Sequence, residues 1–523
     1  MSLPRGVREL LLPELPPGAA VTLTDPGGVR PLLTFIGADG RTRVRVRTHR
    51  AGDYSVAVPD GSAIGWRVEQ NEHPGGPLLR RSGRRLVDEE GIPFFWLADT
   101  WWFTLCDRVS TDELRELARL RVRQGFTVVQ VVAGLLPEVD AFDELGDLGG
   151  RWPWTPEFGD IDPRWWDDAE QRLAIIVEEG LTPAVVGGWS YYLLDAGPER
   201  MRRHWREVLA RWAAFPVVWC VAGEAGLPHY HQLDEPRLDD VVAGLSAGWR
   251  EIAAEVRTLD GYRSVVTVHP CPAFAHFSST DAIGSADDLD LIWLQTGHAD
   301  RSSIDDSLIA LDRELAAPHG LPVINSEVCY EGIAAGSSAT LQRFLFFSHV
   351  LSGAAGHSYG AQGLWAFRRS EDPGPGIMWG DATWQEAAAL PGSAQLGRCA
   401  TFLRSFDWAA LVPAPDALSV HASDRCRVLP YAARVGDALI AYVPAVSLLP
   451  ADRGISRALR DLTFTGLRPG RWRVDYWNPR HEDAQRGFES DVGDDGRLPL
   501  HAATRQSAVP SMEDWVVVVS PIG

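Results

Sequence analysis

The spacing of hydrophobic and polar residues changes twice along the 523-residue chain. In residues 1–85, short segments such as 41–48 alternate between polar and apolar side chains, which is typical of half-buried strands. In residues 86–410, apolar runs of strand length alternate with segments whose apolar residues recur every three or four positions. In residues 411–523 the short alternating segments return. The pattern predicts three domains with these boundaries, the first and last being β-sandwiches.

Two details of the N-terminal domain follow from the same pattern. Residues 31–36 form one apolar run and are predicted to be one strand. Arginine occupies alternate positions of 41–48, and this row is predicted to be a solvated face rather than a binding patch.

The middle domain is predicted to contain eight strands separated by helices. The runs are rich in Val, Ile and Leu, as expected of strands buried on both faces of a parallel sheet. The predicted strands are 93–99, 126–133, 181–186, 217–222, 264–268, 289–294, 321–326 and 356–359. Eight strands alternating with helices predict an α/β fold, a (β/α)8 TIM barrel, flanked by the two β-sandwich domains.

Two of the predicted barrel strands end in glutamate. Glu224 follows 217–222, and Glu327 follows 321–326. The C-terminal ends of the strands form the active site of a TIM barrel, so both carboxyl groups are expected there. Glycosidic cleavage needs two such groups: one protonates the leaving oxygen, and the other attacks the sugar or activates water. We expect Glu327 to be the nucleophile and Glu224 the acid/base, with His229 or Tyr230 tuning its pKa. The alternative for either glutamate is a helix cap or an ion-pair partner.

Polar and aromatic side chains follow the other strand ends, with few formal charges among them. The candidate substrate contacts are Asp99, Trp101, Trp102, Gln130, Trp189, Tyr191, His229, His269, Gln295, His298, Tyr330, His357, Tyr359 and Trp365. Such a ring suits a neutral polyhydroxylated ligand better than a phosphorylated one, which favours clustered Arg or a Gly-rich loop at a helix N-terminus. The alternatives are core packing for the tryptophans, His357 and Tyr359, and a turn cap for Asp99.

Composition narrows the function classes. The chain has no Lys, which excludes Schiff-base chemistry on a lysine, and its net charge of -20 argues against nucleic-acid and anionic-membrane partners. We find no signal-peptide segment and no apolar run of membrane-spanning length. The six Cys residues lack CxxC spacing. These features predict a cytoplasmic protein with free, buried thiols, no cofactor and no bound metal. A homo-oligomer is left open.

Three functions fit these observations. The one we favour is a retaining, exo-acting glycosidase for a small oligosaccharide or glycoside, furanosides included, because the loops at 134–162 and 366–392 are long enough to close a pocket. A carbohydrate-binding barrel without turnover is the second. A metal-dependent hydrolase is the third, with the imidazoles of His229, His231, His269 and His298 as its ligands.

The sequence at the start of the barrel resembles a known family. The segment is Arg85-Leu-Val-Asp-Glu-Glu-Gly-Ile-Pro-Phe-Phe-Trp-Leu-Ala-Asp-Thr-Trp101. It is similar to the opening motif of the apiosidase-like glycoside hydrolases, and the likeness extends over about residues 80 to 410. The resemblance implies a retaining barrel whose acid/base and nucleophile fall on Glu224 and Glu327. This chain has Ala222-Gly223-Glu224 where the family usually has Gly-Gly-Asp, so the resemblance does not predict the sugar.

Overall fold

Eight parallel strands form the centre of the chain in the computed structural model, which describes residues 3–16, 18–71, 76–230, 233, 237–298, 300–333, 337–372, 380–420, 426–449, 461–481, 484–500 and 509–522. The strands are β10 (Trp96–Thr100), β11 (Val128–Val132), β12 (Thr182–Val186), β13 (Val218–Cys220), β14 (Val266–Thr267), β15 (Ile292–Gln295), β16 (Val323–Glu327) and β17 (Gly356–Ser358). Their order is β14-β13-β12-β11-β10-β17-β16-β15. At the remaining gap the Asp290 amide donates to the Val266 carbonyl at 2.8 Å. The predicted (β/α)8 barrel is thereby confirmed.

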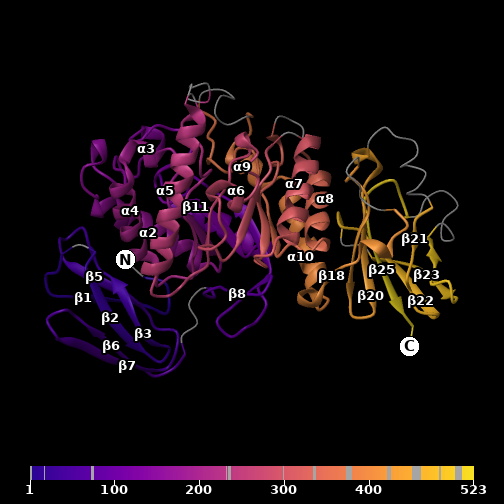
Figure 1. Cartoon of the computed structure of the whole chain (residues 1–523), viewed down its shortest axis with the longest axis horizontal. Coiled ribbons are helices and arrows are strands. Elements are labelled where there is room, and N and C mark those ends of the chain that lie inside the picture. Colours follow the sequence, from indigo (N-terminus) through magenta and orange to yellow (C-terminus); the bar gives the residue numbers. More distant parts are fainter. Residues whose placement is uncertain are drawn as a thin grey trace.

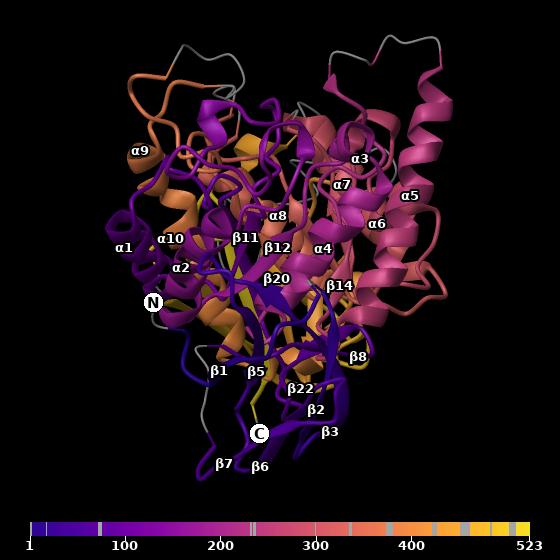
Figure 2. The same ribbon diagram turned by 90° about the vertical axis from the view of Figure 1, so that its left-hand side faces the viewer.

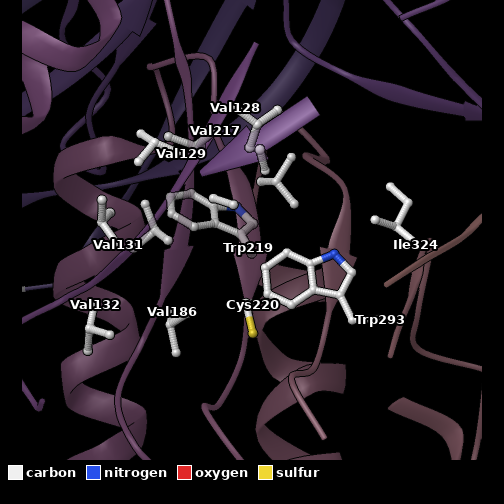
Figure 3. Close-up of a cluster of buried hydrophobic side chains, with 14 of the residues drawn as sticks. Val128, Val129, Val131, Val132, Val186, Val217, Trp219, Cys220, Trp293 and Ile324 are labelled. Carbon is white, nitrogen blue, oxygen red and sulfur yellow. The ribbon is translucent and has the colours of Figure 1, made fainter. Parts of the chain in front are cut away.

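Helices surround these strands. They are α1 (Thr111–Arg123), α2 (Pro163–Glu178), α3 (Tyr192–Ala196), α4 (Pro198–Trp212), α5 (Leu238–Leu259), α6 (Ser279–Ile283), α7 (Asp300–Ala316), α8 (Ala339–Leu351), α9 (Trp384–Ala388) and α10 (Pro391–Arg404). Local sequence defines their starts: Ser110 and Glu113 form a capping box before α1, and Pro163 occupies the first turn of α2. Valine side chains and two large indoles, Trp219 and Trp293, fill the core around the strands (Figure 3).

Two antiparallel sheets precede the barrel. One has the order β1-β5-β4 and the other β3-β2-β6-β7. Their strands are β1 (Val7–Leu11), β2 (Ala20–Asp25), β3 (Gly28–Leu33), β4 (Phe35–Ile36), β5 (Thr42–Arg47), β6 (Gly52–Ala57) and β7 (Ala63–Val68), and a hairpin of β8 (Arg80–Ser82) and β9 (Arg85–Val87) leads into the barrel. The prediction of one strand at 31–36 was wrong, because the chain passes from one sheet to the other at Thr34.

The arginine row of β5 is not solvated, contrary to the prediction. Arg45 and Arg47 are 3% and 0% exposed. The Arg45 guanidinium forms an ion pair with Glu170 on α2 and donates to the Arg211 carbonyl on α4 at 2.8 Å. Period-two alternation places these side chains on one face of the strand, and the contacts of Arg45 turn that face toward α2 and α4. The N-terminal sheets lie below the barrel in Figure 2. The row therefore joins the N-terminal sheets to the barrel.

An antiparallel sheet of order β18-β19-β20-β25-β22-β23 follows the barrel, on the opposite side from the N-terminal sheets (Figure 1). Its strands, with the two-stranded ribbon of β21 and β24, are β18 (Val412–Pro413), β19 (Tyr431–Val435), β20 (Ala438–Val443), β21 (Thr463–Phe464), β22 (Gly470–Trp477), β23 (Ala484–Val492), β24 (Leu498–Pro499) and β25 (Trp515–Pro521). Arg343 on α8 donates twice to Asp514, at 2.7 Å to each oxygen, and Tyr442 donates to the same carboxylate at 3.0 Å. This buried network attaches the sheet to the barrel.

Five of the six cysteines are buried, and Cys426 is partly buried. Among the helices of the described residues, none combines the length and the apolar character that crossing a membrane requires.

Candidate active site

The carboxyl groups of Glu224 and Glu327 are joined by one amide. Gln295 Nε2, at the end of β15, donates to Glu224 Oε1 at 3.1 Å and to Glu327 Oε1 at 3.0 Å. Glu224 is 8% exposed and Glu327 5% exposed. The two glutamates come from strand ends that are 103 residues apart in the chain, so only closure of the barrel brings them together.

An irregularity in β16 turns Glu327 toward the site. Leu294 pairs with Asn325, but the next residue of β15, Gln295, pairs with Glu327, so Ser326 is an extra residue in a β-bulge. Without the bulge, strict alternation would point Ser326 and Glu327 to opposite faces. With it, Ser326 Oγ contacts His269 while Glu327 faces Gln295.

Two histidines adjoin the Glu327 carboxylate. His298 Nε2 is hydrogen-bonded to Oε1 at 3.0 Å, and His269 Nε2 lies 3.3 Å from Oε2. The Ser326 hydroxyl donates to the Leu294 carbonyl, so His269 Nδ1 is the donor to Ser326 Oγ. Burial alone would raise the pKa of Glu327, but the hydrogen bonds and charges of the two histidines outweigh it and hold that pKa well below its usual range.

Glu224 has different surroundings. Tyr230 Oη donates to its Oε2 at 2.7 Å, and Trp189 Nε1 donates to the same oxygen at 3.0 Å. Burial raises the pKa of Glu224, and the charge of Glu327 raises it further, while the hydrogen bonds from Tyr230 and Gln295 partly oppose this. The same site therefore holds one carboxyl group poised to keep a proton and one poised to stay ionised.

The backbone around Glu224 is unusual at two neighbouring positions. Glu224 itself has φ +46, in the left-handed region that costs a non-glycine residue of order 1 kcal/mol or more. A Cβ on Gly223 would lie 2.1 Å from the Trp189 ring. Only glycine therefore lets the indole approach close enough to reach the Glu224 carboxyl group.

Aromatic rings enclose the carboxyl pair. Trp102 meets Trp189 edge to face at 5.6 Å and His269 at 5.7 Å, and its Nε1 donates to Tyr330 Oη at 3.2 Å. The Tyr330 ring contacts His298 at 4.5 Å. Of the predicted contacts, the structure thus gathers Trp102, Trp189, His269, Gln295, His298 and Tyr330 around the two glutamates.

Asp99 and Trp101 do not fit the predicted sugar contact. Asp99 is 1% exposed, and its Oδ2 accepts bonds from Arg121 Nε at 2.6 Å and from Trp101 Nε1 at 2.9 Å. Because side chains alternate along β10, Asp99 faces α1, whereas Thr100 faces the interior and contacts Gln130. Asp99 is a buried ion-pair partner of Arg121, a role that neither the expected sugar contact nor the turn-cap alternative describes.

Three other predicted contacts are likewise occupied by protein groups. Gln130 Nε2 donates to Thr100 Oγ1 and to the Ser326 carbonyl, both at 2.9 Å. His357 lies 3.3 Å from His349 on α8, and Tyr359 Oη donates to Glu331 at 2.6 Å. His357 and Tyr359 face the helices, because Ser358 between them points inward to Trp96.

The remaining predicted contacts lie in the loops around the strand ends. Trp365 packs edge to face on Phe103 at 5.9 Å. Tyr191 stacks on His229 at 4.4 Å, and His229 Nε2 contacts Asp195 at 2.8 Å, so of the two expected tuning residues it is Tyr230 that contacts Glu224.

The structure adds a third carboxyl group that the sequence prediction missed. Glu138 follows β11 in a loop. Burial raises its pKa, and the charges of Glu224 and Glu327 add to that shift, which brings the pKa to about 8. The sequence feature that could have identified Glu138 is an acidic residue in the loop that follows a barrel strand. It was overlooked because Glu138 stands six residues beyond the strand end instead of closing it.

The described residues contain no group of three or more His, Cys, Asp or Glu side chains placed to hold a metal ion. His231, part of the metal-site alternative, lies outside the described residues.

Comparisons with known proteins identify the family. Residues 80–410 match the apiosidase-like catalytic domain. The chain belongs to this family of glycoside hydrolases, which act on O-glycosyl bonds.

Solved structures show how far the fold of this apiosidase-like chain is shared. A glycoside hydrolase, 20% identical with a TM-score of 0.68, covers 86% of this chain and 97% of its own. A family 5 glycoside hydrolase from Bacteroides vulgatus, 19% identical, has the same TM-score and covers 85% of this chain and 93% of its own. A second structure from that organism, 15% identical with a TM-score of 0.67, covers 99% of both chains, flanking sheets included. Comparison with curated protein sequences gives no match.

Proposed function

We propose that this apiosidase-like protein is a retaining, exo-acting glycosidase for a small, neutral glycoside or oligosaccharide. Glu327 is the nucleophile and Glu224 the acid/base. The observation that carries the proposal is the amide of Gln295 shared by two carboxyl groups whose pKa values are shifted in opposite directions. Such a pair supplies an acid and a nucleophile at one pH.

The spacing of the pair supports retention. Glu224 Oε1 and Glu327 Oε1 both contact Gln295 Nε2, so these two oxygens are at most about 6 Å apart. Retaining enzymes hold their two carboxyl groups about 5 Å apart, whereas inverting enzymes need ~6.5–9.5 Å to admit a water molecule.

The reaction then has two steps. Glu327 attacks the anomeric carbon while Glu224 gives its proton to the leaving oxygen, which breaks the glycosidic bond and forms a glycosyl ester on Glu327. Glu224, now ionised, takes a proton from water, whose oxygen attacks the anomeric carbon and releases Glu327. His269 and His298 stabilise the ionised nucleophile, and the Trp189 and Tyr230 donors keep the Glu224 oxygens oriented.

Burial of the pair favours a small substrate. Both carboxyl groups are almost covered by aromatic rings, an arrangement that suits the end of a chain better than its interior. The neutral polar groups of the ring match sugar hydroxyls.

The test is hydrolysis of 4-nitrophenyl glycosides, furanosides and pyranosides, by wild type, Glu327→Ala and Glu224→Ala. We expect one glycoside to be cleaved with retention by NMR, the loss of Glu327 to abolish turnover, and azide to rescue Glu224→Ala as a glycosyl azide. Turnover that survives Glu327→Ala would overturn the assignment. Sugar affinity without hydrolysis in wild type would favour the binding-protein alternative. Glu157→Gln, at an exposed glutamate, is the control.

A further inference from the structure

Glu138 is held in a strained conformation on a fastened loop. Its backbone φ is +58, in the left-handed region that residues other than glycine rarely adopt. Tyr192 Oη donates to the carbonyls of Leu136 and Val139 at 3.2 and 3.0 Å, and Tyr191 Oη also donates to Leu136, at 3.1 Å. Two tyrosines from the next strand end thus fix the backbone on both sides of Glu138. A strained residue held in place by its neighbours is commonly part of a functional site.

The Glu138 carboxyl group lies close to the catalytic pair but lacks a partner of its own. Its Oε2 is buried and accepts no hydrogen bond from any described residue. Burial and the charges of Glu224 and Glu327 all raise its pKa, to about 8. A buried polar atom without a partner destabilises the fold, so its presence calls for an explanation.

We propose that Glu138 binds hydroxyl groups of the sugar ring that Glu327 attacks. The inference rests on the proposed function and adds a specificity residue to it. Tyr191, which holds the loop at Leu136, has its ring 6.2 Å from that of Tyr230, and Tyr230 donates to Glu224. The loop that carries Glu138 therefore borders the side of the site where Glu224 lies. A carboxyl group that is mostly protonated near neutral pH both donates and accepts hydrogen bonds, as adjacent sugar hydroxyls do.

The test compares Glu138→Ala and Glu138→Gln with wild type on the 4-nitrophenyl glycoside that wild type cleaves best. We expect kcat/KM to fall about 10- to 100-fold for Ala and less for Gln, which retains a donor and an acceptor. Deoxy analogues of the same glycoside, each lacking one hydroxyl group, identify the hydroxyl that Glu138 binds. Wild type should hydrolyse the analogue without that hydroxyl with a lower kcat/KM, and Glu138→Ala should lower kcat/KM for that analogue only slightly further. Unchanged kcat/KM and equal penalties on every analogue would overturn the proposal.

The control is Glu157→Gln. Glu157 has φ +62 and lies in the same interstrand segment, but its side chain is exposed, so kcat/KM should not change. Melting temperature separates binding from support of the fold: removing an unpartnered buried carboxyl group should leave Tm unchanged or raise it, whereas a structural role predicts a fall.

Two outcomes distinguish this proposal from the proposed function. If Glu327→Ala abolishes turnover while Glu138→Ala does not alter it, only the role of Glu138 fails. If no glycoside is cleaved, binding of neutral monosaccharides is measured by tryptophan fluorescence, since Trp102 and Trp189 line the site. If Glu138→Ala weakens the affinity for the monosaccharide at least tenfold, the role of Glu138 in binding sugar hydroxyls is supported even without turnover. Affinity that it leaves unchanged, or no affinity in wild type, overturns it.

Discussion

Replacing Gln295 with methionine is the sharpest perturbation of the site. Gln295→Met keeps the length of the side chain but removes both hydrogen bonds to Glu224 and Glu327. A hydrogen bond to a charged group is worth about 1.5–3 kcal/mol, and the two share one amide, so we take the combined loss as about 3 kcal/mol. At about 1.4 kcal/mol for each factor of ten, kcat/KM should fall roughly 100-fold.

The same change has a signature in the pH profile. The hydrogen bond from Gln295 lowers the pKa of Glu224, against the effects of burial and of Glu327. Its removal should raise that pKa, so the alkaline limb of kcat/KM, where the acid loses its proton, moves to higher pH. Stopped assays with the best 4-nitrophenyl glycoside over a pH series measure both effects. Gln171→Met, at an exposed position of α2, is the matched control.

A wild-type kcat/KM in Gln295→Met, or an alkaline limb that moves to lower pH, would refute the reasoning. The first result would mean that the shared amide does not contribute to catalysis. The second would mean that Glu224 is not the acid that the limb reports.

Three further predictions concern the site and its support. Gly223→Ala should lower kcat/KM about tenfold, because the new Cβ displaces Trp189 from the Glu224 carboxyl group; normal kinetics would show that this contact is dispensable. Arg45→Met leaves the fully buried Glu170 with only the more distant Arg211, at 4.0 Å, and should cost about 3 kcal/mol, seen as a lower Tm, and adding Glu170→Leu should recover much of it. The raised pKa of Glu138 means that its contribution to stability, present below pH 4.5, is lost as the pH rises toward about 8. The Tm advantage of Glu138→Gln over wild type should therefore grow across that range, and a constant difference would contradict it.

The sequence placed Glu224 and Glu327 at strand ends on one rim of the barrel, as the structure does, but several of the other expected contacts point elsewhere. Glu224 and Glu327 were identifiable because each directly follows an apolar run, and strand ends in a barrel share one face. Asp99 also ends such a run, yet it pairs with Arg121. Whether the last side chain of a strand points into the barrel or toward the helices depends on the exact register of the strand. A shift of one residue reverses that direction.

Bulges and loops account for the other differences. The extra residue at Ser326 turns Glu327 inward, and no hydrophobic pattern marks it. Glu138 reaches the site through a loop of no fixed period, held by hydrogen bonds from tyrosines that lie more than 50 residues away in the chain.

The sequence by itself determined the order of strands and helices, the barrel and the position of the two glutamates at its rim, because these depend on periodicity and on local caps and turns. Only the tertiary structure decided which polar groups meet: Gln295 between the carboxyl groups, Glu138 beside them, and the arginines of β5 buried against α2 and α4. Such contacts join residues that are distant in the chain, and their energy depends on distance and burial, which no local pattern encodes.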